Sequence, residues 1–195
     1  SVALHAQMKS GVQRGQTCAV FGAGALGVLI AALTRRAGAS RVFVSDINPF
    51  RLEKALELGA TDVINSLAVN PVEIIQTMTA QMGVDCTFEA VGLGTTLLQA
   101  INAVKKGGMV TLVGIYENPD VIMPANLIVQ REIRLAGSQA YCGDFEASLA
   151  LLENGEIDLK KMITHRLALQ EIQQGFELLT GSPSDALKVV ITMGT

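Results

Sequence analysis

Three glycines and one carboxylate, at a fixed spacing, are the residues of this 195-residue sequence that could do chemistry together. Gly22, Gly24 and Gly27 directly follow a short apolar run, and Asp46 ends the next run. Glycine permits a tight strand-to-helix turn at the first position, close approach of a ligand to the backbone at the second, and close helix packing at the third. A helix that begins there offers free amides and a partial positive charge. The spacing therefore predicts a turn that binds an anionic ligand.

The context of this turn predicts which ligand it binds. The turn follows a strand-like run and opens a helix-like segment, and Asp46 comes about twenty residues later, at the end of the second strand. Its carboxylate can accept both hydroxyls of an adenosine ribose and would repel the 2′-phosphate of NADP; the alternative is that it only caps a helix. We predict a Rossmann-type site for NAD. The residues expected there from these two strand ends are Gly22, Ala23, Gly24, Ala25, Leu26, Gly27, Asp46 and Ile47.

Further contacts are expected from neighbouring strand ends, because ligands of open α/β sheets lie outside the carboxyl ends of the strands. Small residues there would let the nicotinamide half lie against the backbone, although simple strand-exit turns would have the same composition. Arg51, one helical turn beyond Asp46, is either a second ribose contact or a solvated helix residue. The remaining predicted cofactor contacts are Ala90, Val91, Gly92, Val113, Gly114, Ile115 and Ser138.

Apolar, strand-like runs alternate with segments of helical period, which predicts an α/β fold made of βαβ units. We expect a Rossmann fold: a six-stranded, parallel, doubly wound sheet with helices on both faces. Strands are expected at Thr17–Phe21, Arg41–Ser45, Asp62–Asn65, Val84–Glu89, Met109–Val113 and Glu132–Gly137, with a turn at Lys105–Gly108 and a short edge strand near Val121–Met123. Helices are expected at Ala25–Ala37, Asn48–Leu58, Asn70–Met82, Thr95–Val104 and Ala125–Gln130.

The regular alternation of strand-like and helix-like segments ends near Tyr141, which predicts two parts. These are a Rossmann NAD-binding domain over residues 1–140 and a C-terminal α/β annex over residues 141–195. In the annex, Asp144 is a candidate N-cap for a helix that Gly155 ends. The expected annex elements are a helix at Phe145–Asn154, a strand at Met162–Arg166, a helix at Glu171–Leu179 and a strand at Leu187–Met193.

Composition argues against several classes of protein. The net charge is −3 and the sequence has no basic run, so we expect no nucleic-acid partner. Apolar stretches are broken before the roughly 18 residues of a membrane span, and Ser1–Ser10 lacks the pattern of a signal peptide, so we expect a cytoplasmic protein. Hydrophobic residues make up 49% of the chain, which suits a sheet buried on both faces or a surface that a partner covers.

The cysteines and histidines predict neither disulfides nor a metal site. Cys18, Cys86 and Cys142 are far apart, form no CxxC pair and suit a reducing compartment. The two histidines, His5 and His165, are too few for a zinc site of the usual kind. We interpret both, and Cys142, as structural. We expect neither a catalytic residue nor a metal ligand in this chain.

Taken together, these motifs closely resemble the cofactor-binding half of the medium-chain dehydrogenases, in their zinc-dependent alcohol and polyol branch. The glycine turn differs from that of the zinc-free quinone reductases, and Ile133–Phe145 is most similar to the butanediol, sorbitol and threonine dehydrogenase group. The matching stretches, which cover essentially the whole chain, are Gly15–Gly24, Ser45–Asn48, Leu58–Ala60, Val84–Gly92, Lys106–Gly108 and Leu159–His165.

The resemblance implies properties that the residues alone do not. Family members begin with a GroES-like catalytic domain that supplies the catalytic zinc, so we expect this chain to bind NAD without catalysing hydride transfer from a secondary alcohol. The annex would return to the absent catalytic domain, and Lys188 would contact the cofactor's phosphate. A homodimer is expected through edge strands near Val121–Met123 and Glu132–Gly137.

Two other functions remain open at this point. A stand-alone NAD-binding or redox-sensing module without catalysis would have the same composition. A methyltransferase shares the glycine-rich first turn and the acidic end of the second strand, although Gly27 and a sixth parallel strand argue against it.

Overall fold

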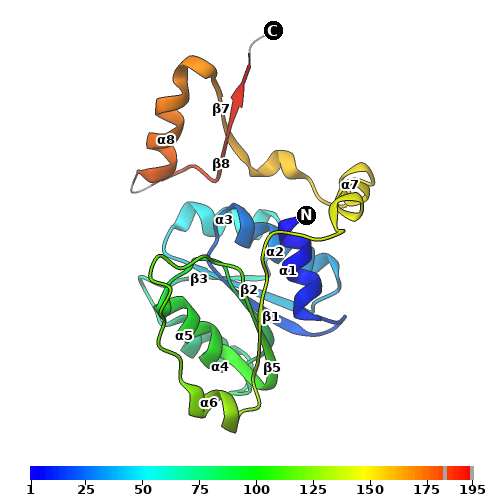
Figure 1. Ribbon diagram of the computed structural model, residues 1–195, viewed down its shortest axis with the longest axis vertical. Helices are drawn as coiled ribbons and strands as arrows, with labels where there is room; N and C mark the ends of the chain where they lie inside the picture. Colours follow the sequence, from blue (N-terminus) through cyan, green and yellow to red (C-terminus); the bar gives the residue numbers. More distant parts are fainter. Residues whose placement is uncertain (182–183, 194–195) are drawn as a thin grey trace.

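A six-stranded parallel sheet is the centre of the computed structural model, which describes residues 1–181 and 184–193. The strand order is β3-β2-β1-β4-β5-β6, which is the order of dinucleotide-binding folds. Figure 1 shows the sheet in the lower body of the molecule. The strands are β1 (Thr17–Phe21), β2 (Arg41–Asp46), β3 (Asp62–Asn65), β4 (Val84–Glu89), β5 (Val104–Leu112) and β6 (Arg134–Gly137).

The register brings the carboxyl ends of the central strands to one edge of the sheet. Phe21, the last residue of β1, is paired with Ser45 of β2 and with Glu89 of β4. Glu89 is in turn paired with Leu112, the last residue of β5. The glycine turn and the turns that follow β2, β4 and β5 are therefore neighbours in space, as a ligand that spans the sheet requires.

Helices cover both faces of the sheet, and each face has its own apolar core. Val20 and Val44 pack with one group of helices, whereas the alternate residues Phe21 and Phe43 pack with the other group. Because both faces are buried, β1 and β2 contain continuous buried apolar runs, Cys18–Phe21 and Val42–Val44, rather than alternating ones. The helices of the first face are α1 (Val2–Ser10), α2 (Ala25–Arg36) and α3 (Pro49–Glu57); those of the second are α4 (Pro71–Met78), α5 (Gly94–Ala103) and α6 (Ala125–Gln130).

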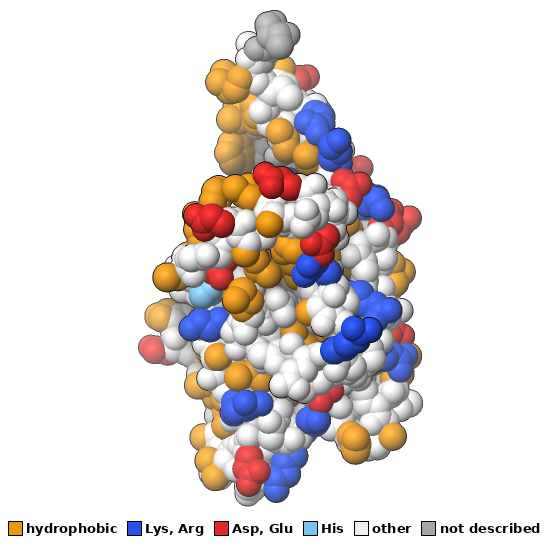
Figure 2. Space-filling model, turned by 90° about the vertical axis from the view of Figure 1, so that its right-hand side faces the viewer, with side chains coloured by type: hydrophobic (Ala, Val, Ile, Leu, Met, Phe, Trp, Pro, Cys, Tyr) orange, Lys and Arg blue, Asp and Glu red, His pale blue; other side chains and the backbone are white. Residues whose placement is uncertain are grey.

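The C-terminal part contains a separate two-stranded parallel sheet, β7 with β8, beside helix α8. It lies above the main body in Figure 1, and Figure 2 shows it as a narrow upper part with hydrophobic side chains at its surface. Asn48 Nδ2 donates to Ser184 O at 2.7 Å and so ties the two parts together. The elements are α7 (Phe145–Glu153), η1 (Leu159–Met162), β7 (Ile163–Ala168), η2 (Leu169–Glu171), α8 (Ile172–Thr180) and β8 (Lys188–Thr192).

Most predicted elements are present within one or two residues of their predicted bounds, and four predictions were wrong. Val121–Met123 is a loop rather than an edge strand, and proline follows it directly at position 124, which keeps it from extending as a strand. The expected turn Lys105–Gly108 lies within β5, where the register with β4 shifts between Val84 and Cys86. Helix α4 ends at Met78 rather than Met82, because Ala80 and Gln81 have left-handed backbones.

The fourth error concerns Asp144, which occupies the N-cap position of α7 without capping it. Its carboxylate instead accepts hydrogen bonds from the Cys142 amide and from His5 Nδ1.

Among the described residues, no helix is both long enough and apolar enough to cross a membrane.

Candidate cofactor site

The glycine turn after β1 is packed so closely that two of its glycines leave no space for a side chain. Gly22 has a φ of +106°, and a Cβ built on it would lie 2.6 Å from Val91 Cγ2. A Cβ on Gly27 would lie 1.9 Å from the carbonyl oxygen of Gly22. The first glycine therefore allows the turn and the third allows α2 to begin directly against it, as their spacing predicted.

Gly24, between them, lies at an open surface instead. Apart from Gly24 and its two chain neighbours, no residue of the described chain would come within 4 Å of a Cβ built on Gly24. Gly24 is also the N-cap residue of α2, and no side chain of the described residues caps that helix. The uncapped amides carry the positive end of the helix dipole. This surface therefore has the shape and the charge to receive a phosphate group.

Asp46 lies against this turn, although it ends a different strand. Its Oδ2 accepts a hydrogen bond from the Ala23 amide at 2.6 Å, and its Oδ1 accepts one from the Asn48 amide at 2.8 Å. The cap of α3 is Asn48, whose Oδ1 accepts from the amides of Phe50 and Arg51. Each Asp46 oxygen has a further lone pair beyond these bonds, so the carboxylate can still accept hydrogen bonds from a ligand.

Arg51 and Ser138 bring buried polar atoms without partners to the same edge of the sheet. Arg51 Nε, in the first turn of α3, and Ser138 Oγ, after β6, are buried and make no hydrogen bond within the described part of the chain. A buried polar atom without a partner costs free energy. Both atoms lie beyond carboxyl ends of strands, where a bound ligand could satisfy them.

Glu89 is a site residue that the predicted contacts omitted. It ends β4 and is fully buried. Its Oε1 accepts hydrogen bonds from the amides of Val91 and Gly92, both at 2.9 Å, and from Thr96 Oγ1 at 2.7 Å. Its Oε2 accepts one from the Tyr116 hydroxyl at 2.9 Å. The position of Glu89 at a strand end was the only signal in the sequence, because its partners become neighbours only in the fold.

The turns after β4 and β5 lie backbone against backbone. Gly92 has a φ of +92°, and a Cβ on it would lie 2.3 Å from the carbonyl oxygen of Ile115. A Cβ on Gly114 would lie 2.3 Å from the Gly92 amide nitrogen and 2.6 Å from Glu89 Oε2. The predicted contacts in these two turns are thus brought together. Val91 after β4 and Ile115 after β5 are exposed large apolar side chains that could contact a flat ring, and Ile47 is exposed in the same way after β2.

Lys188, which the family resemblance places at the cofactor's phosphate, lies in the C-terminal part. It is the first residue of β8 and is exposed. Within the described ranges, its ammonium group forms no ion pair that would fix it at the glycine turn. The bond between Asn48 and Ser184 brings the chain before β8 to the end of β2.

The two histidines interpreted as structural bond to residues outside the glycine turn. His165 Nδ1 lies 3.1 Å from Thr164 Oγ1, and His5 bonds to Asp144. Throughout the described chain the three cysteines are free thiols; Cys18 and Cys86 are buried, whereas Cys142 is exposed. Among the same residues, no three His, Cys, Asp or Glu side chains gather to hold a metal ion.

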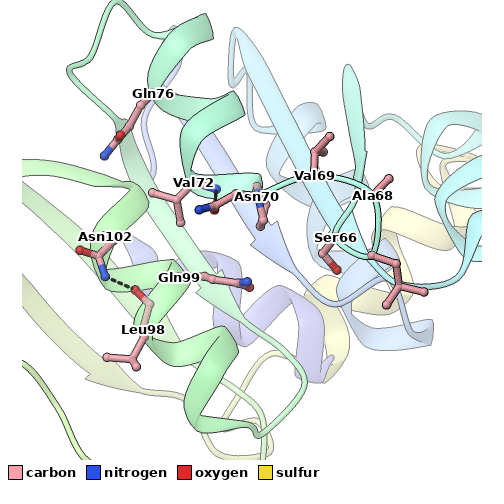
Figure 3. A pocket seen from close by; sticks show the side chains of 11 residues that line it. Ser66, Ala68, Val69, Asn70, Val72, Gln76, Leu98, Gln99 and Asn102 are labelled. Carbon is pink, nitrogen blue, oxygen red and sulfur yellow. Dashed lines mark hydrogen bonds between the residues drawn. The ribbon is translucent and has the colours of Figure 1, made fainter.

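A hollow of about 620 Å³ lies between the β3–α4 loop and α5. Figure 3 shows the side chains of Asn70, Gln99 and Asn102 around it, and the Asn102 amide bonds to the Leu98 carbonyl. Its lining residues carry no charge and include none of the predicted cofactor contacts. A second hollow, of about 480 Å³, borders Gly92 and Tyr116.

Comparison with known proteins places this chain in a family. A family model described as zinc-binding dehydrogenase matches residues 25–154. Sorbitol dehydrogenase of Bacillus subtilis is 30% identical over 191 residues, which are 98% of this chain and 54% of that protein. (R,R)-butanediol dehydrogenase of Neisseria gonorrhoeae is 31% identical over 193 residues, again 98% of this chain and 54% of the relative.

Solved structures agree with the sequence comparison. The alcohol dehydrogenase of Thermus sp. ATN1 superposes with a TM-score of 0.91 at 31% identity, over 99% of this chain and 55% of that chain. A zinc-binding dehydrogenase of Sinorhizobium meliloti 1021, solved bound to NADP, superposes with a TM-score of 0.89 at 27% identity, over 98% of this chain and 56% of that chain. The chain thus spans about half the length of its relatives. It belongs to the zinc-binding dehydrogenase family and corresponds to about half of such an enzyme.

Proposed function

We propose that this chain is the NAD(H)-binding portion of a zinc-dependent alcohol or polyol dehydrogenase. The observation that carries the proposal is the hydrogen bond between Asp46 and the Ala23 amide, which holds an acidic strand end against an open, uncapped glycine turn. One surface thereby combines donors for a pyrophosphate with acceptors for ribose hydroxyls.

Different residues around this surface would bind different parts of the cofactor. The amides from Gly24 to Gly27 would bind the pyrophosphate, and Asp46 the adenosine ribose, with Arg51 as a second contact to that ribose. Lys188 would approach a phosphate from the C-terminal part. The nicotinamide half would lie along the turns at residues 90–92 and 113–115 and near Ser138. When bound, NAD supplies the hydride acceptor, and the protein supplies position and electrostatics.

Asp46 supports NAD rather than NADP as the cofactor. A carboxylate at the end of the second strand accepts ribose hydroxyls and repels a 2′-phosphate. The NADP-bound relative at 27% identity shows that NADP is bound within this family. The preference of this chain therefore depends on the residues at its own second strand end.

The C-terminal part, residues 141–195, is proposed as a segment that packs against the portion of the enzyme that this chain does not contain. Helix α8 is amphipathic, and Ile172, Phe176 and Leu179 on it stay exposed beside Val189 and Ile191 of β8. Such an apolar surface is typical of a face that another part of a protein covers.

A homodimer is proposed through the β6 edge of the large sheet. Within the described chain β6 has a strand neighbour on one side only, and exposed strand edges favour pairing with another chain. The apolar side chains of Ile122, Met123 and Val129 are exposed nearby in sequence. Because Val121–Met123 is a loop, strand pairing would use Arg134–Gly137 alone.

Titration of the purified chain with NADH, followed by NADH fluorescence and by calorimetry, tests the proposed function. We expect saturable binding of NADH and NAD and no turnover of sorbitol, butanediol or threonine, because no described cluster of this chain could hold the metal that polarises an alcohol. Turnover by the chain alone would contradict its proposed non-catalytic role. A thermal shift with S-adenosylmethionine and none with NAD would contradict NAD binding itself.

A stand-alone NAD-binding module is the second candidate, and its isolated chain would give the same titration. The gene around this sequence separates the two: zinc ligands encoded upstream favour the enzyme, whereas a complete reading frame without them favours the module.

A further inference from the structure

Glu89 is a buried acid whose position the proposed cofactor contacts do not explain. Its side chain is 0% exposed, between strands β1 and β5 at the carboxyl edge of the sheet. A carboxyl group taken out of water is costly unless hydrogen bonds replace its hydration. An apolar side chain of similar size would avoid that cost altogether, so the hydrogen bonds of Glu89 are the feature to explain.

Four donors surround the two carboxylate oxygens, and they come from three separate segments. The amides of Val91 and Gly92 belong to the turn after β4, and the hydroxyl of Thr96 belongs to the first turn of α5. The hydroxyl of Tyr116 belongs to the loop after β5. Three of the donors lie at Oε1 and one lies at Oε2, so both carboxylate oxygens are hydrogen-bonded, by contacts that link these segments.

The backbone of Glu89 adds to the same connection. Its carbonyl oxygen accepts from the amides of Val113 at 2.8 Å and of Gly114 at 3.0 Å. One residue therefore bonds to both cofactor-facing turns, through its main chain and its side chain. The first of these turns also bonds to the end of β1, directly before the glycine turn, because the Ala90 amide donates to the carbonyl oxygen of Phe21 at 2.9 Å.

Tyr116 remains a donor to Glu89 over the ordinary pH range. Burial, and then the neighbouring Glu89 carboxylate, raise the pKa of the Tyr116 phenol above its usual range. The phenol therefore keeps its proton at neutral pH.

We propose that Glu89 is a positioning residue for the dinucleotide, one that fixes the turn at residues 90–92 and the loop at residues 113–116 as a single preformed wall beside the glycine turn. This inference rests on the proposed NAD binding. A wall that is already fixed before binding does not lose conformational entropy when the ligand arrives, which increases affinity. The half of NAD that lies on this wall should depend on Glu89, whereas AMP, held by Asp46 and the glycine turn, should depend on it less.

Glu89→Gln and Tyr116→Phe test this role, with the dissociation constants of NAD and AMP measured for each variant by calorimetry. Gln keeps an oxygen for the Oε1 donors but removes the negative charge, and Phe removes only the side-chain hydrogen bond from the loop after β5. We expect NAD binding to weaken about three- to tenfold in each, as for the loss of one charge-assisted hydrogen bond. We expect AMP binding to stay within about twofold.

Thr96→Val and Thr95→Val form a matched pair. The Thr96 hydroxyl lies 2.7 Å from Glu89 Oε1 and 2.9 Å from the Leu93 carbonyl oxygen, either of which can accept its one hydrogen. Thr95, the preceding residue of the same helix, is exposed. We expect Thr96→Val to weaken NAD binding and Thr95→Val to leave it unchanged. If Glu89→Gln does not fold, Tyr116→Phe and this pair decide the question.

Equal losses of NAD and AMP binding in Tyr116→Phe and Thr96→Val would indicate a merely structural role and overturn the inference. So would unchanged NAD binding in folded Glu89→Gln and Tyr116→Phe. A wild-type chain that binds AMP and NAD equally well would contradict the predicted wall. A wild-type chain that binds neither would refute the proposed function itself, which is a separate and recognisable result.

Discussion

His5 and Asp144 are 139 residues apart in the sequence, and a hydrogen bond of 2.7 Å joins His5 Nδ1 to Asp144 Oδ2. His5 lies on α1, at the start of the chain, and Asp144 immediately precedes α7. The bond therefore attaches the segment that links the large sheet to the C-terminal part to α1, a helix that covers the large sheet. Both side chains are largely shielded from water, which limits screening of the interaction.

The pH dependence of stability should reveal this contact. The Cys142 amide and then His5 hold the pKa of the Asp144 carboxyl below its usual range. A carboxyl group whose pKa is lower in the folded than in the unfolded protein stabilises the fold at pH values above the pKa of the unfolded state. This stabilisation is lost as the pH falls through the lower pKa of the folded state. We expect the urea midpoint of Asp144→Asn to lie below that of the wild type at pH 7, and the difference to begin to shrink as the pH falls below about 4.

Asp120→Asn, a change at an exposed carboxylate in the loop after β5, is the control for this experiment. The urea midpoint of Asp120→Asn should equal that of the wild type at every pH. A gap between Asp144→Asn and the wild type that stays constant down to pH 3 would show that the ionised carboxylate contributes nothing.

The two glycines of the turn should separate folding from ligand binding. In Gly27→Ala the new methyl group would meet the Gly22 carbonyl at 1.9 Å, so we expect a loss of about 1–3 kcal/mol of unfolding free energy. In Gly24→Ala the methyl group meets no atom of the described chain within 4 Å other than those of its own residue and its two neighbours. Stability should then stay within about 1 kcal/mol, while NAD affinity falls more than about tenfold because the methyl group occupies the phosphate's space.

Thermal unfolding and NAD titration of both variants provide the measurement. A stable Gly24→Ala protein with wild-type NAD affinity would show that no ligand approaches the backbone there.

The oligomeric state should respond to a charge beside the β6 edge. Val129 on α6 is 75% exposed, and Met82, after α4, is 68% exposed. In light scattering at micromolar concentration we expect the wild type and Met82→Glu to be dimers. We expect the dimer dissociation constant of Val129→Glu to be at least tenfold higher than that of the wild type, because the substitution introduces a charge beside the proposed interface. A monomeric wild type would disprove the proposed dimer.

The sequence was sufficient to predict the large sheet because its signals are local. Thr17–Phe21 and Val84–Glu89 are short strand-like segments next to glycines, and their observed bounds are the predicted ones. The capping signal at Asn48 likewise marks the start of α3. Each of these features depends on residues within one turn or one strand, so propensity and pattern were enough.

The features that sequence reasoning missed depend on contacts between distant segments. Glu89 bonds to Tyr116, 27 residues away, and nothing near Glu89 in the sequence indicates that partner. Asp144 matches a helix cap locally, but its carboxylate bonds to His5 on the first helix. The apolar residues at Val121–Met123 suggested a strand, yet strand formation requires a neighbouring strand to pair with, which the sequence pattern alone does not provide.

The binding of NAD and NADP to Asp46→Ala, measured by calorimetry beside the wild type and the control Asp120→Ala, tests the central claim most directly. Asp46 should accept hydrogen bonds from the ribose of NAD, and its charge should oppose the 2′-phosphate of NADP. We expect the dissociation constant of NAD to rise about 10- to 100-fold in Asp46→Ala, from the loss of hydrogen bonds to a charged group, while that of NADP rises less or falls. A larger loss for NADP than for NAD, or wild-type binding of NAD by Asp46→Ala, would contradict the proposed site.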